Sequence, residues 1–197
     1  MFVLWSVLAA CAPSPESGES LPPTLSASGT AVPAELVESY LQEAFQVDDP
    51  FERRERVLVA TEVFLRSTDV QQADDRAASA TFTEIAFSSQ RLRLRDPGFI
   101  RRSGALAVVG LPDGLGMVLY DLSQPPGDGL LELTRWTVGL SALEVDWGQD
   151  EFGVSYATLG NDQAIRVHFL LATRAETGWQ VAWPGDEEAG WWFNATN

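Results

Sequence analysis

The spacing of apolar residues changes once along this chain, and that change restricts the fold more than any other feature. In residues 34–66 the apolar positions recur at helical spacing, whereas from Thr81 onward they alternate with a period of two. The first pattern predicts amphipathic helices, and the second predicts half-buried strands. We therefore expect an α+β fold, in which two or three N-terminal helices pack on a curved antiparallel sheet of about six to eight strands.

Two helices are well marked. Residues 34–46 carry one apolar face, made of Leu36, Val37, Tyr40, Leu41, Ala44 and Phe45. A second helix begins at Asp49-Pro50, where Asp49 suits the N-cap and Pro50 the first turn, and it extends to residue 66. The charged stretch 52–56 is interpreted as a solvated face of this helix. The polar, Ala-rich residues 71–80 predict a loop or a short third helix.

Short segments with strand-like patterns fill the rest of the chain. They are residues 81–87, 90–95, 105–111, 116–122, 130–138, 143–147, 152–159, 163–173 and 179–183. Turn residues at 112–114 and 160–162 predict two hairpins.

The N-terminus carries a signal for localisation. The run Leu8-Ala9-Ala10-Cys11 resembles a bacterial lipobox, at which a leader is cut and the new N-terminal cysteine receives lipid. Residues 1–10 are apolar and too short to cross a membrane core of about 30 Å, so they fit a signal peptide. The leader lacks the usual positive charge, which indicates a translation start further upstream. The resemblance implies a lipoprotein of the cell envelope, held by Cys11 on the extracytoplasmic face of a bacterial membrane.

The remaining organisation follows from composition. Residues 11–33 are rich in Pro, Ser and Gly and predict a flexible tether after the lipidated Cys11. Residues 34–184 suit a single α+β domain, and residues 185–197 form an aromatic C-terminal tail.

Charge and cysteine content exclude several classes of function. The chain has 28 acidic residues against 13 basic ones, a net charge of −15, which argues against binding nucleic acid or docking on anionic lipid through basic residues. Cys11 is the only cysteine, so no disulfide forms within the chain.

The last third of the chain resembles a known superfamily. Residues 143–146, 152–159 and 164–172, followed by Gly178-Trp179-Gln180-Val181, are similar to the closing meander of the nuclear-transport-factor-2-like (SnoaL-like) superfamily. The resemblance implies a cone-shaped domain with a pocket between sheet and helices. The superfamily includes both enzymes and binding modules, so the resemblance does not establish a function.

Few residues suggest catalysis. The only histidine, His168, lies on a predicted strand with Arg166, opposite the face that carries Ile165, Val167, Phe169 and Leu171. A sheet-surface role is the favoured interpretation of His168. One histidine and a lipidated cysteine exclude the usual zinc sites, and the acidic clusters lack the spacing of a calcium loop. We assign no catalytic residue, metal or cofactor.

Tyrosines leave an enzymatic alternative open. Some enzymes of the resembling superfamily use an Asp base with a Tyr or an acid that stabilises an oxyanion. Tyr40, Tyr120, Asp121 and Tyr156 supply these residue types, although their spacing places no two of them in one pocket. Ordinary core and rim positions are the competing interpretation for these tyrosines.

The aromatic tail leaves a further alternative. Trp191, Trp192 and Phe193 form either a partner-docking patch or a segment that folds back on the sheet. The main expectation is a lipid-anchored extracytoplasmic binding or assembly module without catalytic activity, which contacts an envelope protein or a small apolar ligand. The alternatives are a small-molecule enzyme with a pocket Asp/Tyr pair, and an accessory subunit that docks through its tail.

Overall fold

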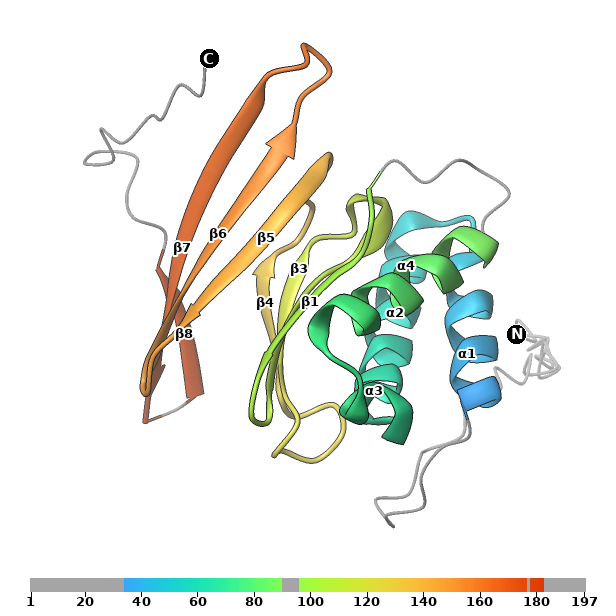
Figure 1. Ribbon diagram of the computed structural model, residues 1–197, viewed down its shortest axis with the longest axis horizontal. Coiled ribbons are helices and arrows are strands. Elements are labelled where there is room, and N and C mark those ends of the chain that lie inside the picture. The colour runs from blue at the N-terminus through green and yellow to red at the C-terminus, as the bar shows by residue number, and fades with distance from the viewer. Residues whose placement is uncertain (1–33, 90–95, 177, 183–197) are drawn as a thin grey trace, which may run out of the picture.

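The computed structural model describes residues 34–89, 96–176 and 178–182. In this part of the chain four α-helices precede eight strands (Figure 1). The helices are α1 (Ala34–Phe45), α2 (Pro50–Arg66), α3 (Thr68–Gln72) and α4 (Asp75–Ser89). The strands are β1 (Phe99–Ser103), β2 (Leu106–Gly110), β3 (Met117–Asp121), β4 (Leu130–Thr134), β5 (Leu140–Trp147), β6 (Glu151–Leu159), β7 (Ile165–Ala175) and β8 (Gly178–Ala182).

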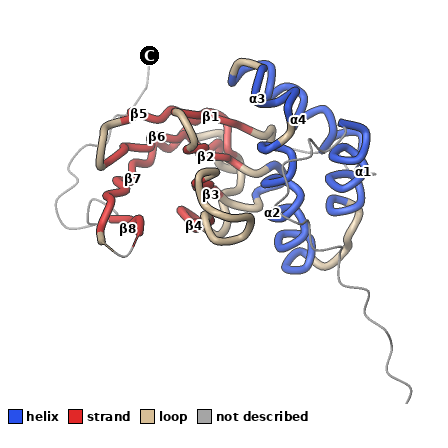
Figure 2. Tube along the Cα trace, turned by 90° about the horizontal axis from the view of Figure 1, so that it is seen from below, coloured by secondary structure: helices blue, strands red, loops and turns tan. Residues whose placement is uncertain are grey.

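The strands form two antiparallel sheets in which each strand pairs with the next one along the chain. Sheet A has the order β1-β2-β3-β4, and sheet B has the order β5-β6-β7-β8. Sheet A lies between the helices and sheet B, so the described residues form three layers (Figure 1). Strands β1 and β5 lie side by side, and the two sheets diverge from there (Figure 2).

Both faces of sheet A are buried along its central strands β2 and β3. On β2 and β3, Ala107, Val109, Val118 and Tyr120 face the helices and join their apolar core. The alternating residues Val108, Met117 and Leu119 belong to a second core shared with sheet B. Because successive side chains point to opposite faces, a strand buried on both sides has a continuous apolar sequence.

Among the described residues, only one face of sheet B is covered. Its inner face contributes residues such as Leu143, Phe152, Val154 and Leu170 to the second core. Its outer face is solvent-exposed, although β7 places large apolar side chains on it.

The N-terminus of α2 confirms the local prediction. The Asp49 carboxylate accepts the backbone N–H groups of Phe51 (3.0 Å) and Glu52 (2.8 Å), and Pro50 occupies the first turn. Arg54 lies in the stretch 52–56 that was interpreted as a solvated face, but only 3% of this residue is exposed, so the interpretation is wrong for Arg54. Its guanidinium donates to the carbonyl oxygens of Leu115 (3.1 Å) and Arg135 (3.2 Å), which ties α2 to sheet A.

Several element predictions need correction. Residues 81–87, expected as a strand, lie within α4, where Phe82, Ile85 and Ala86 are buried at helical spacing. The expected strand 90–95 lies outside the described residues, and β1 was not predicted. The described part holds four α-helices rather than two or three, and its eight strands divide into two sheets rather than one. The division falls after β4, where Gly139 adopts a positive φ of 78° directly before β5.

Candidate functional site

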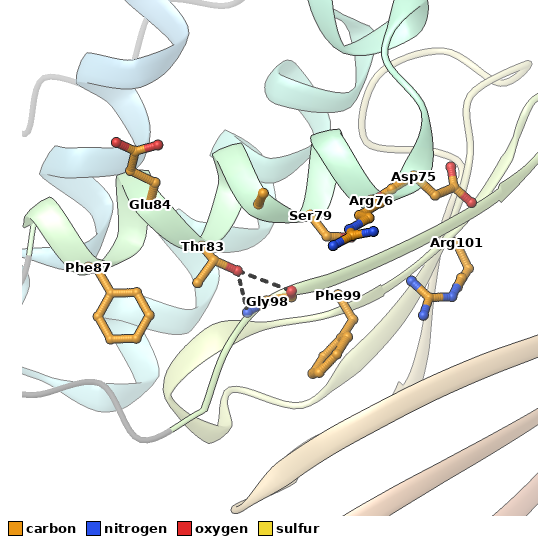
Figure 3. Close-up of a pocket in the computed structure, with 10 residues that line it drawn as sticks. Asp75, Arg76, Ser79, Thr83, Glu84, Phe87, Gly98, Phe99 and Arg101 are labelled. Carbon is orange, nitrogen blue, oxygen red and sulfur yellow. Dashed lines mark hydrogen bonds between the residues drawn. The ribbon is translucent and has the colours of Figure 1, made fainter.

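A hollow of about 910 Å³ lies between α4 and β1, and we call it the α4–β1 cleft (Figure 3). It is lined by Asp75, Arg76, Ser79, Ala80, Thr83, Glu84 and Phe87 from α4, and by Gly98, Phe99 and Arg101 from β1 and the residue before it. The cleft is open to solvent, and its volume falls in the range of small-molecule sites.

Polar side chains of α4 seal the free edge of β1. Thr83 bonds both backbone groups of Gly98 (3.0 and 3.1 Å), Ser79 accepts the N–H of Ile100 (2.8 Å), and Asp75 accepts the N–H of Arg102 (2.9 Å). Four helical residues rise about 6.0 Å and two strand residues about 6.6 Å, so side chains four apart on a helix match alternate strand residues. Helix α4 thus satisfies an edge that would otherwise be free to pair with another strand.

Because of these hydrogen bonds, the hydroxyls of Ser79 and Thr83 are not available as catalytic groups. The Ser79 hydroxyl bonds the Asp75 carbonyl (2.6 Å) as well as β1, and the Thr83 hydroxyl both donates to Gly98 and accepts from it. If either hydroxyl were diverted to a substrate, a buried backbone N–H would lose its partner at a cost of about 1–3 kcal/mol.

Two arginines, Arg76 and Arg101, lie at the end of the cleft where α4 begins, beside the carboxylate of Asp75, which is paired with Arg102. Because Asp75 and Ser79 bond residues 102 and 100, Arg101 lies level with this part of the helix. Arg101 forms a 3.2 Å ion pair with Glu144 of sheet B. Arg76 is exposed, and among the described residues it has no ion-pair partner. Figure 3 shows the Arg76 and Arg101 side chains at the same end of the cleft.

The rest of the cleft is mainly apolar. Ala80, Phe87 and Phe99 provide its carbon surface, and 47% of Phe87 is exposed although it is a large apolar side chain. Glu84 points away from Gly98 (Figure 3). The cleft therefore combines an exposed aromatic surface at one end with cations at the other.

Two of the predicted site residues lie in the helical core. Tyr120 is 2% exposed, and its hydroxyl donates to the Leu58 carbonyl oxygen (2.9 Å). Burial raises the pKa of Tyr120 above its ordinary value, and Glu62 adds to the effect. Tyr40 is half-buried against the same core. Neither tyrosine lines the α4–β1 cleft.

Tyr156 and His168 meet on sheet B. They are directly paired across β6 and β7, and their rings stack with centroids 4.7 Å apart. His168 Nε2 shares a 3.0 Å hydrogen bond with the Thr158 hydroxyl. Burial lowers the pKa of His168, with a smaller contribution from Arg166, and burial raises the pKa of Tyr156. Both changes favour uncharged rings. Tyr156 is 6% exposed and belongs to the second core, and half-buried His168 lies beside it on the inner face of sheet B, so we interpret the pair as a stacked contact at the border of that core rather than on the exposed face.

Three predicted sites, Cys11, Trp191 and Trp192, lie outside the described residues. Within the described part, no three His, Cys, Asp or Glu side chains are grouped as metal ligands would be. None of its helices is long and apolar enough to cross a membrane.

In comparisons with known proteins, no family model, no curated protein and no solved structure matches this chain. The resemblances to a lipobox and to the nuclear-transport-factor-2-like superfamily stay predictions. The pocket implied by the second resemblance would lie between sheet and helices. In the described residues that interface is a packed core, and the α4–β1 cleft lies at its border.

Proposed function

We propose that this protein is a lipid-anchored binding module on the extracytoplasmic face of a bacterial membrane. In this proposal the α4–β1 cleft takes a small apolar ligand that carries an acidic group. Two sequence features support the anchor: the run Leu8-Ala9-Ala10-Cys11 and the Pro/Ser-rich tether that follows it. The binding role rests on one observation, that the polar groups in the cleft are committed to β1 while aromatic surface beside them stays exposed.

The ligand chemistry follows from the two ends of the cleft. An apolar body would cover Ala80, Phe87 and Phe99 and gain the free energy of removing carbon surface from water. An acidic group would lie at Arg76 and Arg101, where a guanidinium matches a carboxylate or phosphate in geometry and charge.

The enzymatic alternative gains no support in the described residues. Tyr120 and Asp121 are consecutive on β3, so their side chains point to opposite faces of sheet A. Tyr156 stacks on His168 rather than on a carboxylate.

Calorimetric titration of the full-length protein with decanoate tests the cleft. Decanoate should bind at least tenfold more tightly than decyltrimethylammonium, which has an alkyl chain of similar length and the opposite charge. Ala80→Trp should abolish binding because the indole fills the cleft, whereas Ala77→Trp, on an exposed position of the same helix outside the lining, should bind normally. Arg76→Gln should weaken binding about threefold, as expected for one exposed charge. Equal binding by the Ala80→Trp and Ala77→Trp variants would refute the cleft as the site.

The anchor has a separate test. Cells that express the protein are labelled with a radioactive fatty acid, and the Cys11→Ala variant is labelled in parallel. The proposal predicts label in the unaltered protein only, and equal label in both would contradict it.

A further inference from the structure

The outer face of sheet B carries an exposed apolar row, which we call the β7 face. It consists of Ile165, Val167, Phe169 and Leu171, which are 63%, 41%, 45% and 38% exposed. Alternation along β7 places these four side chains on one side of the strand. Isolated exposed apolar residues are common, but a continuous row of this size marks a contact surface.

A hollow of about 390 Å³ lies beside this row. Gly153 and Ser155 of β6 pair with Leu171 and Phe169, so their small side chains leave a gap next to two large ones. Phe169 lines the hollow on one side, and Glu144 and Asp146 of β5 line it on the other. A Cβ atom at Gly153 would meet nothing within 4 Å, so the gap is open.

The chain leaves sheet B next to this hollow. Ala182, the last residue of β8, pairs with Leu171, and residues 183–197 follow with Trp191, Trp192 and Phe193 among them. Nine residues reach up to about 30 Å, whereas the row from Ile165 to Leu171 spans about 20 Å. The aromatic segment therefore reaches every part of the β7 face.

We propose that residues 191–193 of the same chain pack on the β7 face, with one indole ring in the hollow over Gly153. An aromatic ring over a strand glycine covers the backbone that the glycine leaves bare. The indole N–H would donate a hydrogen bond to the Asp146 carboxylate at the rim of the hollow. The apolar ring and the polar N–H of a tryptophan side chain would then each have a partner. This inference concerns a different surface from the α4–β1 cleft and does not depend on it.

The chain's own tail suits this surface better than a second copy does. A short linker holds the tail at an effective concentration in the millimolar range, which an external partner must exceed. Two β7 faces packed together would bring two copies of a chain with a net charge of −15 into contact, with Glu144, Asp146 and Glu151 on or beside the surface of each.

Fluorine NMR of the full-length protein, with 5-fluorotryptophan incorporated, tests the proposal. Trp191→Phe and Trp192→Phe variants assign the two tail signals, and their positions in urea define the undocked tail. We expect both signals to lie away from the urea positions in the native protein, and Phe169→Ser to shift them toward those positions. Phe87→Ser is the matched control, because Phe87 is 47% exposed and Phe169 45%.

A second variant separates loss of docking from loss of fold. Gly153→Trp fills the hollow from the sheet itself, and the open space at this position accepts the side chain. It should release the tail signals while the signals of Trp147 and Trp179 keep their native dispersion. Tail signals that already match urea in the native protein would overturn the proposal and leave the tail available to a partner. Signals that move with protein concentration would overturn it in favour of a second copy.

Discussion

Sheets A and B have the same number of strands and the same connectivity, yet they relate to solvent in opposite ways. Sheet A is covered by helices on one face and by sheet B on the other, and β2 and β3 are accordingly apolar at nearly every position. Within the described part of the chain, sheet B is covered on its inner face only, yet β7 is apolar on its outer face as well. We therefore infer that sheet A contributes mainly to the stability of the fold. We assign a contact role to the exposed apolar side chains of the β7 face in sheet B.

Glycine substitutions should give the largest contrast between the sheets. Gly116, directly before β3, has a φ of 100°, and a Cβ there would overlap the carbonyl oxygens of Thr134 and Arg135. Gly116→Ala should lower the free energy of unfolding by more than about 4 kcal/mol, whereas Gly153→Ala in sheet B should change it by less than about 0.5 kcal/mol. Chemical denaturation measures both, and equal effects would contradict the packing described for the two sheets.

Leucine truncation tests the same contrast without backbone strain. Leu119 is fully buried between the two sheets, whereas Leu171 is 38% exposed on the β7 face. Leu119→Ala should cost about 3 kcal/mol because it leaves a cavity, and Leu171→Ala should cost less than about 1 kcal/mol. Urea denaturation measures the free energy of unfolding of both variants. A larger decrease for Leu171→Ala than for Leu119→Ala would contradict the assignment of sheet A as the more tightly packed sheet.

Hydroxyl removal tests the sealed edge of sheet A. Thr83→Val keeps the shape of the side chain but leaves the backbone groups of Gly98 without their partner, so it should cost about 1–2 kcal/mol. Ser141→Ala in sheet B removes an exposed hydroxyl bonded to Ala157 and should be nearly neutral. Thermal melts of the two variants compare them, and a neutral Thr83→Val would show that α4 does not hold β1 through this contact.

The smallest effect expected is a pH dependence in sheet B. Burial holds the pKa of His168 below its ordinary 6.5, so the unfolded chain binds a proton more readily than the folded one. The free energy of unfolding therefore has its full value above pH 6.5, and it decreases as the pH falls from 6.5 through the lower pKa of His168 in the folded protein. The melting temperature should drop less between pH 7 and pH 5.5 for His168→Gln than for the unaltered protein. An identical drop in both would show that the Tyr156–His168 stack does not exclude the charged form.

Local sequence predicted the parts of the fold that depend on local contacts. The Asp49-Pro50 start of α2 was predicted correctly because capping involves residues two or three apart. The hairpin between β6 and β7 was predicted from its turn for the same reason. Residues 81–87 were misassigned because Phe82, Ile85 and Ala86 fit a helical face while the same stretch also alternates.

The candidate site could not be predicted in the same way. The bonds that join α4 to β1 connect residues 15 to 27 positions apart, and the side chains concerned have ordinary sequence patterns. The spacing of Asp75, Ser79, Thr83 and Phe87 in steps of four is the one signal that marks this face of the helix. On β7 the alternation identifies two faces, but which face a neighbouring layer covers depends on the arrangement of the sheets.

The most direct test of the binding role is a backbone amide NMR titration of the full-length protein with decanoate. We predict that the signals that shift belong to α4 and β1, with the largest changes near Arg76, Ala80 and Phe99, and that sheet B stays unchanged except around Glu144, the ion-pair partner of Arg101. Shifts confined to sheet B, or no shifts at all, would contradict the assignment of the α4–β1 cleft as a ligand site.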